Sequence, residues 1–246
     1  MPGQGRGSKF RKSVSIATLG FLNMHPIETS APQLPEFRPP VLGSDIETRM
    51  ERLPDGREAR IAGQVELPAG ALTASGDSIL DARTPGGLLG CAQIIRQFAP
   101  DFDPRELRDY VAQRDGSHDL GPLGSAAPEE MARTLADFDV PAHIEQAQSS
   151  EDLAHHLESG SGVLVALNLG ELWNSAAAFG NGEVNAIAVA LAVAREPLTG
   201  DILGWYLNDV VAKQFRTHVD AARMERAWLD AGGWLIVTDI ARRRSI

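Results

Sequence analysis

Apolar residues recur at helical spacing in the segment 88–98, whose sequence is LLGCAQIIRQF. The apolar positions 88, 91, 94, 95 and 98 fall on one side of a helix, so the segment is predicted to be a helix that faces the core. The turn Thr84-Pro85-Gly86-Gly87 leads into this helix, and Pro100 is expected to end it.

Three further helices are predicted from their start signals. Asp103 offers a cap, and Pro104 fits the first helical position after it. The next helix is expected to begin at Pro128, where two acidic residues follow in the first turn. The fourth begins after Ser149, a capping residue, and is expected to end at Ser159-Gly160.

Long apolar runs in the second half predict buried strands. The segments 162–169 (GVLVALNL) and 184–194 (VNAIAVALAVA) are such runs, and the turn 197–201 (PLTGD) predicts a hairpin to a returning strand at 202–207. The other predicted elements are a weak strand at 58–66, a helix at 219–229 and a closing strand at 234–240. Helices followed by an antiparallel sheet predict an α+β fold.

Prolines divide the chain into two parts. Residues 1–45 contain six of the 15 prolines, which are Pro2, Pro26, Pro32, Pro35, Pro39 and Pro40. This composition is typical of a linker, so we expect 1–45 to be a flexible basic and proline-rich segment and 46–246 to be one folded domain.

The net charge of −10 at pH 7 makes a nucleic-acid partner unexpected, because an acidic surface repels phosphates. A basic or neutral peptide or protein partner would be favoured electrostatically. No stretch reaches the roughly 20 apolar residues of a membrane-spanning helix. The segment Ser13–Met24 only loosely imitates a signal peptide, so a cytoplasmic location is expected and secretion is the alternative.

The residues that bind metals and form disulfides are few. Cys91 is the single cysteine, which excludes an intramolecular disulfide and four-thiolate zinc sites. The six histidines form no HExxH or HxH pair, and the adjacent His155 and His156 would point about 100° apart on a helix. We therefore expect no metal site and no cofactor.

Several segments, taken in order, resemble the C39-like cysteine peptidases of the papain-like fold. They are GGLLGCAQIIRQF (86–98), GSAAPEEMARTL (124–135), GVLVALNL (162–169), GEVNAIAVALAV (182–193), LGWYLND (203–209) and MERAWLDAGGWLIVTD (224–239). The resemblance covers about residues 80–240. It implies a helical half packed on an antiparallel sheet, with a cleft between the two halves.

The resemblance also implies where catalytic residues would lie. Aligned through IIRQ (94–97), the nucleophile position falls on Gly86 and the histidine position on Asn185. No glutamine stands near Leu80, the position of the oxyanion donor, and only the orienting position is retained, at Asn208-Asp209. Neither Gly86 nor Asn185 can do the chemistry of a thiolate or an imidazole.

The resemblance therefore suggests an inactive peptidase homologue that acts as a peptide- or protein-binding accessory module. Its binding cleft would be lined by Gly86, Gly87, Trp173, Asn185 and Asp209. The same residues could instead have purely structural roles. Gly86 would then be a turn residue, Asn208-Asp209 a turn pair, and Trp173 a residue that covers the core.

The alternative function is an active thiol peptidase or hydrolase with Cys91 as the nucleophile. Cys91 lies inside the predicted helix at a core-spaced position, where a lone cysteine is usually a small apolar residue. His143 and His218 are the conceivable bases, one just after a proline and the other near a predicted helix start.

Overall fold

The structure is a computed structural model that describes residues 48–64, 86–113, 128–173, 184–209 and 214–241. All of these ranges belong to one compact unit, Pro40–Ile246. The proline-rich segment 1–45 lies outside the described residues, so its expected flexibility stays a prediction.

The helix predicted from apolar spacing and the three predicted from start signals are confirmed. They are α1 (Gly86–Phe98), α2 (Pro104–Gln113), α3 (Pro128–Asp137) and α4 (Ser150–Glu158). At the start of α4, Asp152 Oδ2 accepts the backbone N–H groups of Gln148 and Ser149 at 2.7 and 2.9 Å. These bonds satisfy backbone donors that a helix start leaves open. The short helix α5 (Leu169–Trp173) was not predicted, whereas the predicted helix at 219–229 is formed by α6 (Ala221–Met224) and a π-helical turn, η1 (Glu225–Leu229).

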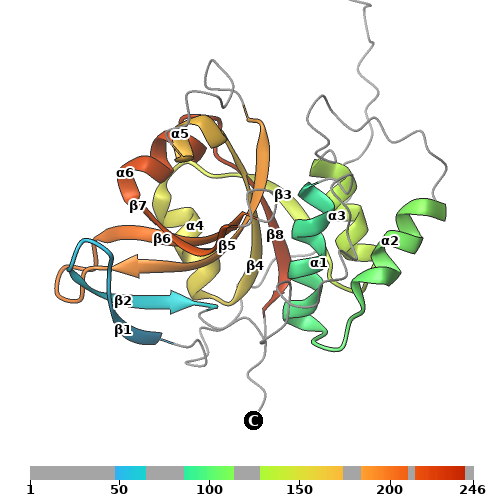
Figure 1. Ribbon diagram of the computed structural model, residues 1–246, viewed down its shortest axis with the longest axis horizontal. Helices are drawn as coiled ribbons and strands as arrows, with labels where there is room; N and C mark the ends of the chain where they lie inside the picture. Colours follow the sequence, from blue (N-terminus) through green and yellow to red (C-terminus); the bar gives the residue numbers. More distant parts are fainter. Residues whose placement is uncertain (1–47, 65–85, 114–127, 174–183, 210–213, 242–246) are drawn as a thin grey trace, which may run out of the picture. The chain divides into compact units, whose positions relative to one another are not determined.

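Eight strands form one antiparallel sheet (Figure 1). They are β1 (Thr48–Arg52), β2 (Glu58–Gly63), β3 (Ala142–Gln146), β4 (Ser161–Leu167), β5 (Ala186–Arg195), β6 (Ile202–Asp209), β7 (Gln214–Asp220) and β8 (Trp234–Ala241). The order is β1-β2-β5-β4-β8-β3, while β6 pairs with the other side of β5 and β7 pairs with β6. The predicted hairpin between β5 and β6 is confirmed.

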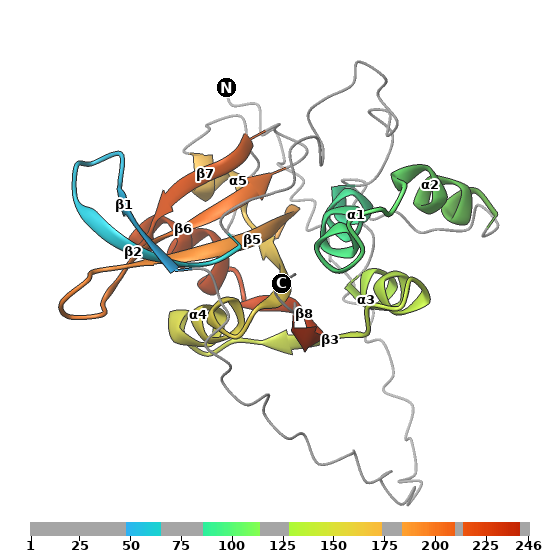
Figure 2. The same ribbon diagram turned by 90° about the horizontal axis from the view of Figure 1, so that it is seen from below.

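The continuous apolar sequence of β5 is explained by burial on both faces. Every residue from Ala186 to Arg195 is buried. Val189 and Leu191 belong to the core that includes α1, α2 and α3, whereas Ala190 and Val193 belong to the core that includes α4 and η1. Figure 2 shows α1, α2 and α3 gathered on one side of the sheet. The α+β class and the helical half packed on an antiparallel sheet are therefore confirmed.

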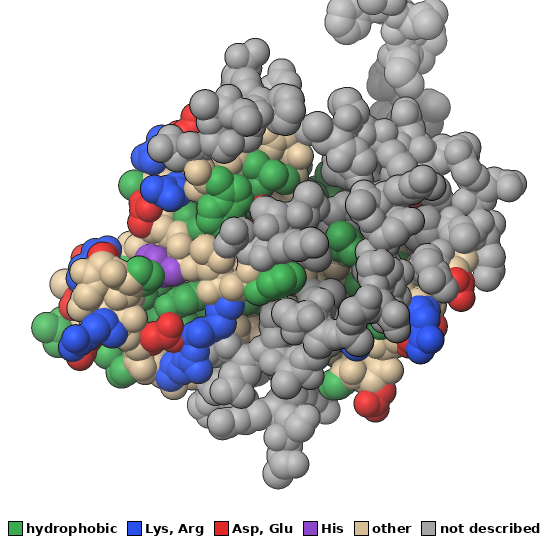
Figure 3. Space-filling view, viewed as in Figure 1, with side chains coloured by type: hydrophobic (Ala, Val, Ile, Leu, Met, Phe, Trp, Pro, Cys, Tyr) green, Lys and Arg blue, Asp and Glu red, His purple; other side chains and the backbone are tan. Residues whose placement is uncertain are grey.

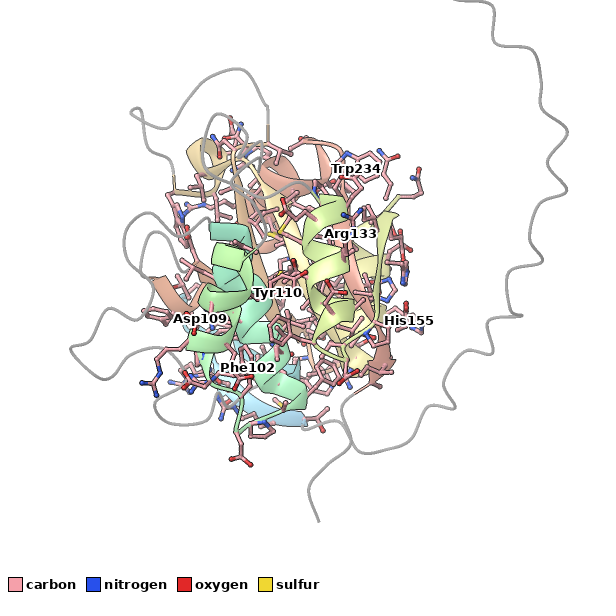
Figure 4. All side chains as sticks on the ribbon, turned by 90° about the vertical axis from the view of Figure 1, so that its right-hand side faces the viewer. Phe102, Asp109, Tyr110, Arg133, His155 and Trp234 are labelled. Carbon is pink, nitrogen blue, oxygen red and sulfur yellow. The ribbon has the colours of Figure 1, made fainter. Side chains whose placement is uncertain are left out.

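Aromatic contacts join the helices of this half. Phe138 packs edge-on against Phe102 and Tyr110, with ring centroids 5.3 Å apart in both pairs. Figure 4 shows Tyr110 between α2 and α3, viewed from the helical side. Edge-to-face pairs add stability beyond their burial, so Phe138 fixes the position of α2 relative to α3.

The predicted weak strand at 58–66 is confirmed as β2, but three other strands were missed: β1, which precedes β2, β3, which lies between α3 and α4, and β7, which follows β6. The predicted helix at 219–229 begins instead at Ala221, after strand β7, because Asp220 Oδ1 accepts the N–H of Arg223 at 2.9 Å and caps the helix there. His218 is consequently a strand residue.

None of the helices in the described parts of the chain is long and apolar enough to cross a membrane.

A buried arginine fastens α4 to the far end of β5. Arg195 donates to Glu158 Oε1 through Nε and to Glu151 Oε2 through Nη2, both at 2.7 Å, and it also donates to the carbonyl of Gly200 in the hairpin turn. Its side chain is only 10% exposed. The arginine lowers the pKa of the Glu151 carboxyl, so this contribution to stability is present near neutral pH and is lost as the pH falls through that pKa.

Replacing Arg195 by methionine is expected to lower the free energy of unfolding by about 2–3 kcal/mol, because two carboxylates and a carbonyl lose their charged donor. Urea unfolding at pH 7 measures the change. The matched control is Arg52→Met, since the Arg52–Glu58 pair is exposed on both sides, and its loss is expected to cost less than about 1 kcal/mol. Equal costs for the two variants would contradict a structural role for Arg195.

Candidate functional site

Strands β5 and β6 bring the predicted positions Asn185 and Asn208-Asp209 to one end of the sheet. Asn185 directly precedes β5, and Asp209 is the last residue of β6. The two strands are antiparallel, with Val189 opposite Asn208. The start of β5 and the end of β6 therefore lie next to each other at the open end of the hairpin.

Helix α1 runs along β5 in the same direction. A Cβ on Gly90 would lie 2.8 Å from Leu164 Cδ2 and 3.8 Å from Ile187 Cγ2. One turn later, Ile94 packs against Gly162 of β4, which lies farther along the sheet. Gly86 precedes Gly90 by one turn, about 6 Å, so the first residue of α1 points toward the end where β5 begins.

The glycine at position 90 permits this close approach. A methyl group there would clash with the Leu164 side chain, so either that side chain or helix α1 would have to shift. Gly86 and Gly87 open the helix, and Gly87 is buried. The sequence therefore places small residues where the helix meets the sheet.

Asn208 joins three elements at this end. Its side chain is fully buried, Nδ2 donates to Gln93 Oε1 of α1 at 3.1 Å, and Oδ1 accepts the backbone N–H of Arg216 in β7 at 2.6 Å. A buried amide without such partners would cost about 1–3 kcal/mol. Both polar ends of the Asn208 amide are thus engaged in holding α1 and β7 against β6.

Asp209 and Asn185 are both bonded to α5. Trp173 Nε1 donates to Asp209 Oδ2 at 3.0 Å, and Asp209 is buried. Asn185 Oδ1 accepts the N–H of Leu169 at 2.8 Å, at the first turn of the same short helix. We call Gln93, Asn185, Asn208 and Asp209 the polar corner.

Helix α5 is the part of this site that the sequence prediction missed. Asn168 Oδ1 accepts the N–H groups of Gly170 and Glu171 at 2.8 and 3.2 Å and so starts the helix. An asparagine directly after a strand is a capping signal, and it could have indicated this turn. Trp173, predicted to line a cleft, is half-buried at the end of α5.

Gln93 adds a polar group that the sequence prediction did not include. It is buried, and its Nε2 has no hydrogen-bond partner. It lies about one turn after Gly90, on the face of α1 that meets the sheet, and its neighbours in the sequence are apolar. Gln93 is the only polar side chain in the segment 88–95 (LLGCAQII), and this lone amide is the signal that could have identified it.

Cys91 lies in a different environment from the polar corner. Its side chain is 0% exposed, and Sγ donates to the carbonyl of Met131 in α3 at 3.7 Å. Burial raises the pKa of the thiol well above its usual range, so the nucleophilic thiolate is disfavoured. The surroundings of Cys91 are those of a small apolar residue in the core.

The two histidines considered as bases lie on other strands. His143 is on β3 and bonds Asp239 of β8 through Nδ1 at 2.5 Å. His218 is on β7, with its ring against Tyr206. Within the described ranges, no hydrogen bond links a histidine to Cys91, Asn185 or Asp209, and no group of three or more His, Cys, Asp or Glu could hold a metal ion.

Cys91 in the native protein is expected to resist iodoacetamide at pH 7.5 and to react fully once the chain is unfolded in guanidinium chloride, because the thiol is buried and protonated. Mass spectrometry of the intact protein measures the label. An added free thiol peptide in the same tube is the control for reagent activity. Rapid native labelling would show that the thiol is accessible and would favour the alternative function.

Comparisons with known proteins give distant structural likenesses. No family model matches the chain, and no curated protein matches it. One similar solved structure is described as a C39-like peptidase from Bacillus anthracis, with 15% identity, 65% of this chain and 90% of that chain covered, and a TM-score of 0.47. Another is a double glycine motif protease from an AMS/PCAT transporter in complex with the leader peptide, with 12% identity, 72% and 94% covered, and a TM-score of 0.43.

Proposed function

We propose that this chain is a C39-like, papain-fold domain that has lost catalysis and acts as a peptide- or protein-binding accessory module. The observation that carries the proposal is the polar corner. Asn185, Asn208 and Asp209 each have a side-chain hydrogen bond that holds an element of the fold, and Gly86 offers no side chain.

Thiol catalysis needs a nucleophile and a base that exchange a proton. An asparagine at position 185 has no proton to exchange near neutral pH, and its Oδ1 already accepts the N–H of Leu169. Asp209 accepts the indole N–H of Trp173, where an orienting carboxylate would accept from a histidine. This arrangement supports a role in binding rather than in bond cleavage.

The chemistry of the partner follows from the charge of the chain. A net charge of −10 favours neutral or basic partners and disfavours phosphate backbones. An extended peptide lying between the start of α1 and the start of β5 is the partner that this geometry supports best. Gly86, Gly87, Trp173, Asn185 and Asp209 are the residues proposed to line that cleft.

The alternative, an active thiol hydrolase that uses Cys91, receives less support. The thiol would have to leave the interface between α1 and α3 to meet a substrate, because it donates to Met131 there and has no exposed surface. No observation on the described residues favours it.

The binding proposal is tested with a short lysine-containing peptide and its glutamate counterpart, by calorimetry. The purified protein is expected to bind the lysine peptide more tightly than the glutamate peptide and to cleave neither. Gly86→Lys is expected to weaken binding of the lysine peptide about tenfold or more, because it places a like charge in the cleft. Ala222→Lys, an equal charge change at an exposed position of α6, is the matched control and should change affinity little.

Two results would contradict the proposal. Equal weakening by Gly86→Lys and Ala222→Lys would place the peptide elsewhere on the surface. Peptide turnover that Cys91→Ala abolishes would show an active thiol enzyme.

A further inference from the structure

Trp234 is a large apolar side chain exposed at the same end of the sheet as the polar corner. It is the first residue of β8 and is 42% exposed. Leu235 lies opposite Val165 of β4, and Leu167 of β4 lies opposite Ala186 of β5. The start of β8 and the start of β5 therefore lie at one end of the sheet, with β4 between them. Figure 4 shows Trp234 at this end.

Trp234 faces the helical side of the sheet. Ile236, two residues later, packs in the core that includes α1 and α3, and alternate residues of a strand share a face. The register places Trp234 beside Ala166 of β4, which pairs with Ile187 of β5. A Cβ on Gly90 would lie 3.8 Å from Ile187 Cγ2, so this row of side chains leads from Trp234 to the first turns of α1.

The indole is held in place by the turn that precedes β8. Gly232 has a φ of 111°, and a Cβ there would lie 3.2 Å from both Cδ1 and Nε1 of Trp234, so the ring rests against the glycine. Trp228 Nε1 donates to the Trp234 carbonyl at 3.3 Å, and Gln146 Nε2 donates to the Gly232 carbonyl at 2.9 Å. A ring fixed in this way loses little conformational entropy when a ligand contacts it.

Three other exposed large apolar side chains lie in different surroundings. Leu198 in the hairpin turn and Ile240 near the end of β8 lie at the opposite end of the sheet. Met50 lies on β1 between Arg49 and Glu51, which form an ion pair at 3.0 Å. Figure 3 shows acidic and basic side chains side by side over the β1–β2 side of the molecule. These positions are therefore less suited than Trp234 to extend the proposed cleft.

The start of α3 brings acidic side chains to the end of the sheet where Trp234 lies. Cys91, in the second turn of α1, donates to the carbonyl of Met131 near the start of α3, so the two helices begin at the same end. The first turn of α3 carries Glu129, which is exposed, and Glu130, which is half-buried. Arg133 follows one turn after Glu129 (Figure 4). These three side chains together are acidic, as is the whole chain with its net charge of −10.

We propose that Trp234 is a subsite of the binding cleft that receives a cationic side chain of the peptide partner, a lysine or an arginine, on the face of its indole. The inference rests on the proposed function and deepens it, because it names one residue of the partner and the group that recognises it. Tryptophan is the aromatic side chain that attracts a cation most strongly, and an acidic surrounding favours the same ligand.

The position of the cationic residue in the peptide follows from the spacing of the strands. Neighbouring strands lie about 4.8 Å apart, so Trp234 of β8 is about 10 Å from the start of β5, where Asn185 lies. An extended peptide covers about 3.3 Å per residue. The cationic residue is therefore expected about three residues from the one that contacts Asn185.

Calorimetry with a lysine peptide and its norleucine counterpart, which has the same length without the charge, tests the subsite. Trp234→Leu is expected to weaken binding of the lysine peptide about tenfold and to change binding of the norleucine peptide little, because leucine offers only apolar contact. Trp234→Phe keeps an aromatic ring and should weaken the lysine peptide less. Ile240→Ala, at an exposed apolar residue of the same strand, is the matched control and should change neither affinity.

Nitrogen-15 NMR gives a second readout on the unaltered protein. The indole N–H signal of Trp234, identified by its absence in Trp234→Phe, is expected to shift when the lysine peptide is added. This readout holds even where Trp234→Leu fails to fold.

Three results would overturn the inference. Equal weakening of both peptides by Trp234→Leu would show an apolar contact in place of a cation site. An unchanged affinity and an unshifted indole signal, while Gly86→Lys still weakens the lysine peptide, would remove this subsite and leave the proposed function standing. No binding of the lysine peptide by the unaltered protein would remove both.

Discussion

The buried amide of Asn208 is the contact on which the arrangement of this end of the molecule depends. Its two polar ends reach α1 through Gln93 and β7 through the backbone of Arg216. Because an unpaired amide in the core costs about 1–3 kcal/mol, both contacts must form together with the packing of α1 on the sheet. Arg216 has a φ of 49°, a left-handed conformation uncommon for a residue with a side chain, and the Asn208 bond helps to hold it there.

This constraint also connects the polar corner with strand β1. The backbone of Arg216 is fixed by Asn208, and its side chain reaches Glu51 of β1 and the Tyr206 ring. Strands β6 and β7 thus carry both the buried amide and the contacts to Glu51. A catalytic role would need Asn208 or Asp209 free to orient a base, whereas here both hold neighbouring elements in place. These contacts are the physical basis for the binding role proposed above.

The sequence predicted the elements whose signals are local. Helix α1 and strand β5 have long regular apolar patterns, and α4 has Ser149 and Asp152 at its start. Strand β3 was missed because AHIEQ is short and has only two apolar residues, and β7 because it is largely polar. Asn185 and Asp209 were singled out from the sequence, but their hydrogen-bond partners were not. Their partners, Leu169 and Trp173, depend on the small helix α5 and on the fold as a whole, which local patterns do not contain.

The hydrogen bonds of Asn208 and Trp173 hold the elements of the polar corner together, and they can be followed by proton exchange. Nitrogen-15 NMR can follow the Nδ2 protons of Asn208 and the indole proton of Trp173 in deuterated buffer. We expect their exchange to be slower by about two orders of magnitude than that of an exposed amide, because these groups are bonded to Gln93 and Asp209. Exchange as fast as that of an exposed amide would show an open, solvated site, in which Asn208 and Asp209 have no structural role.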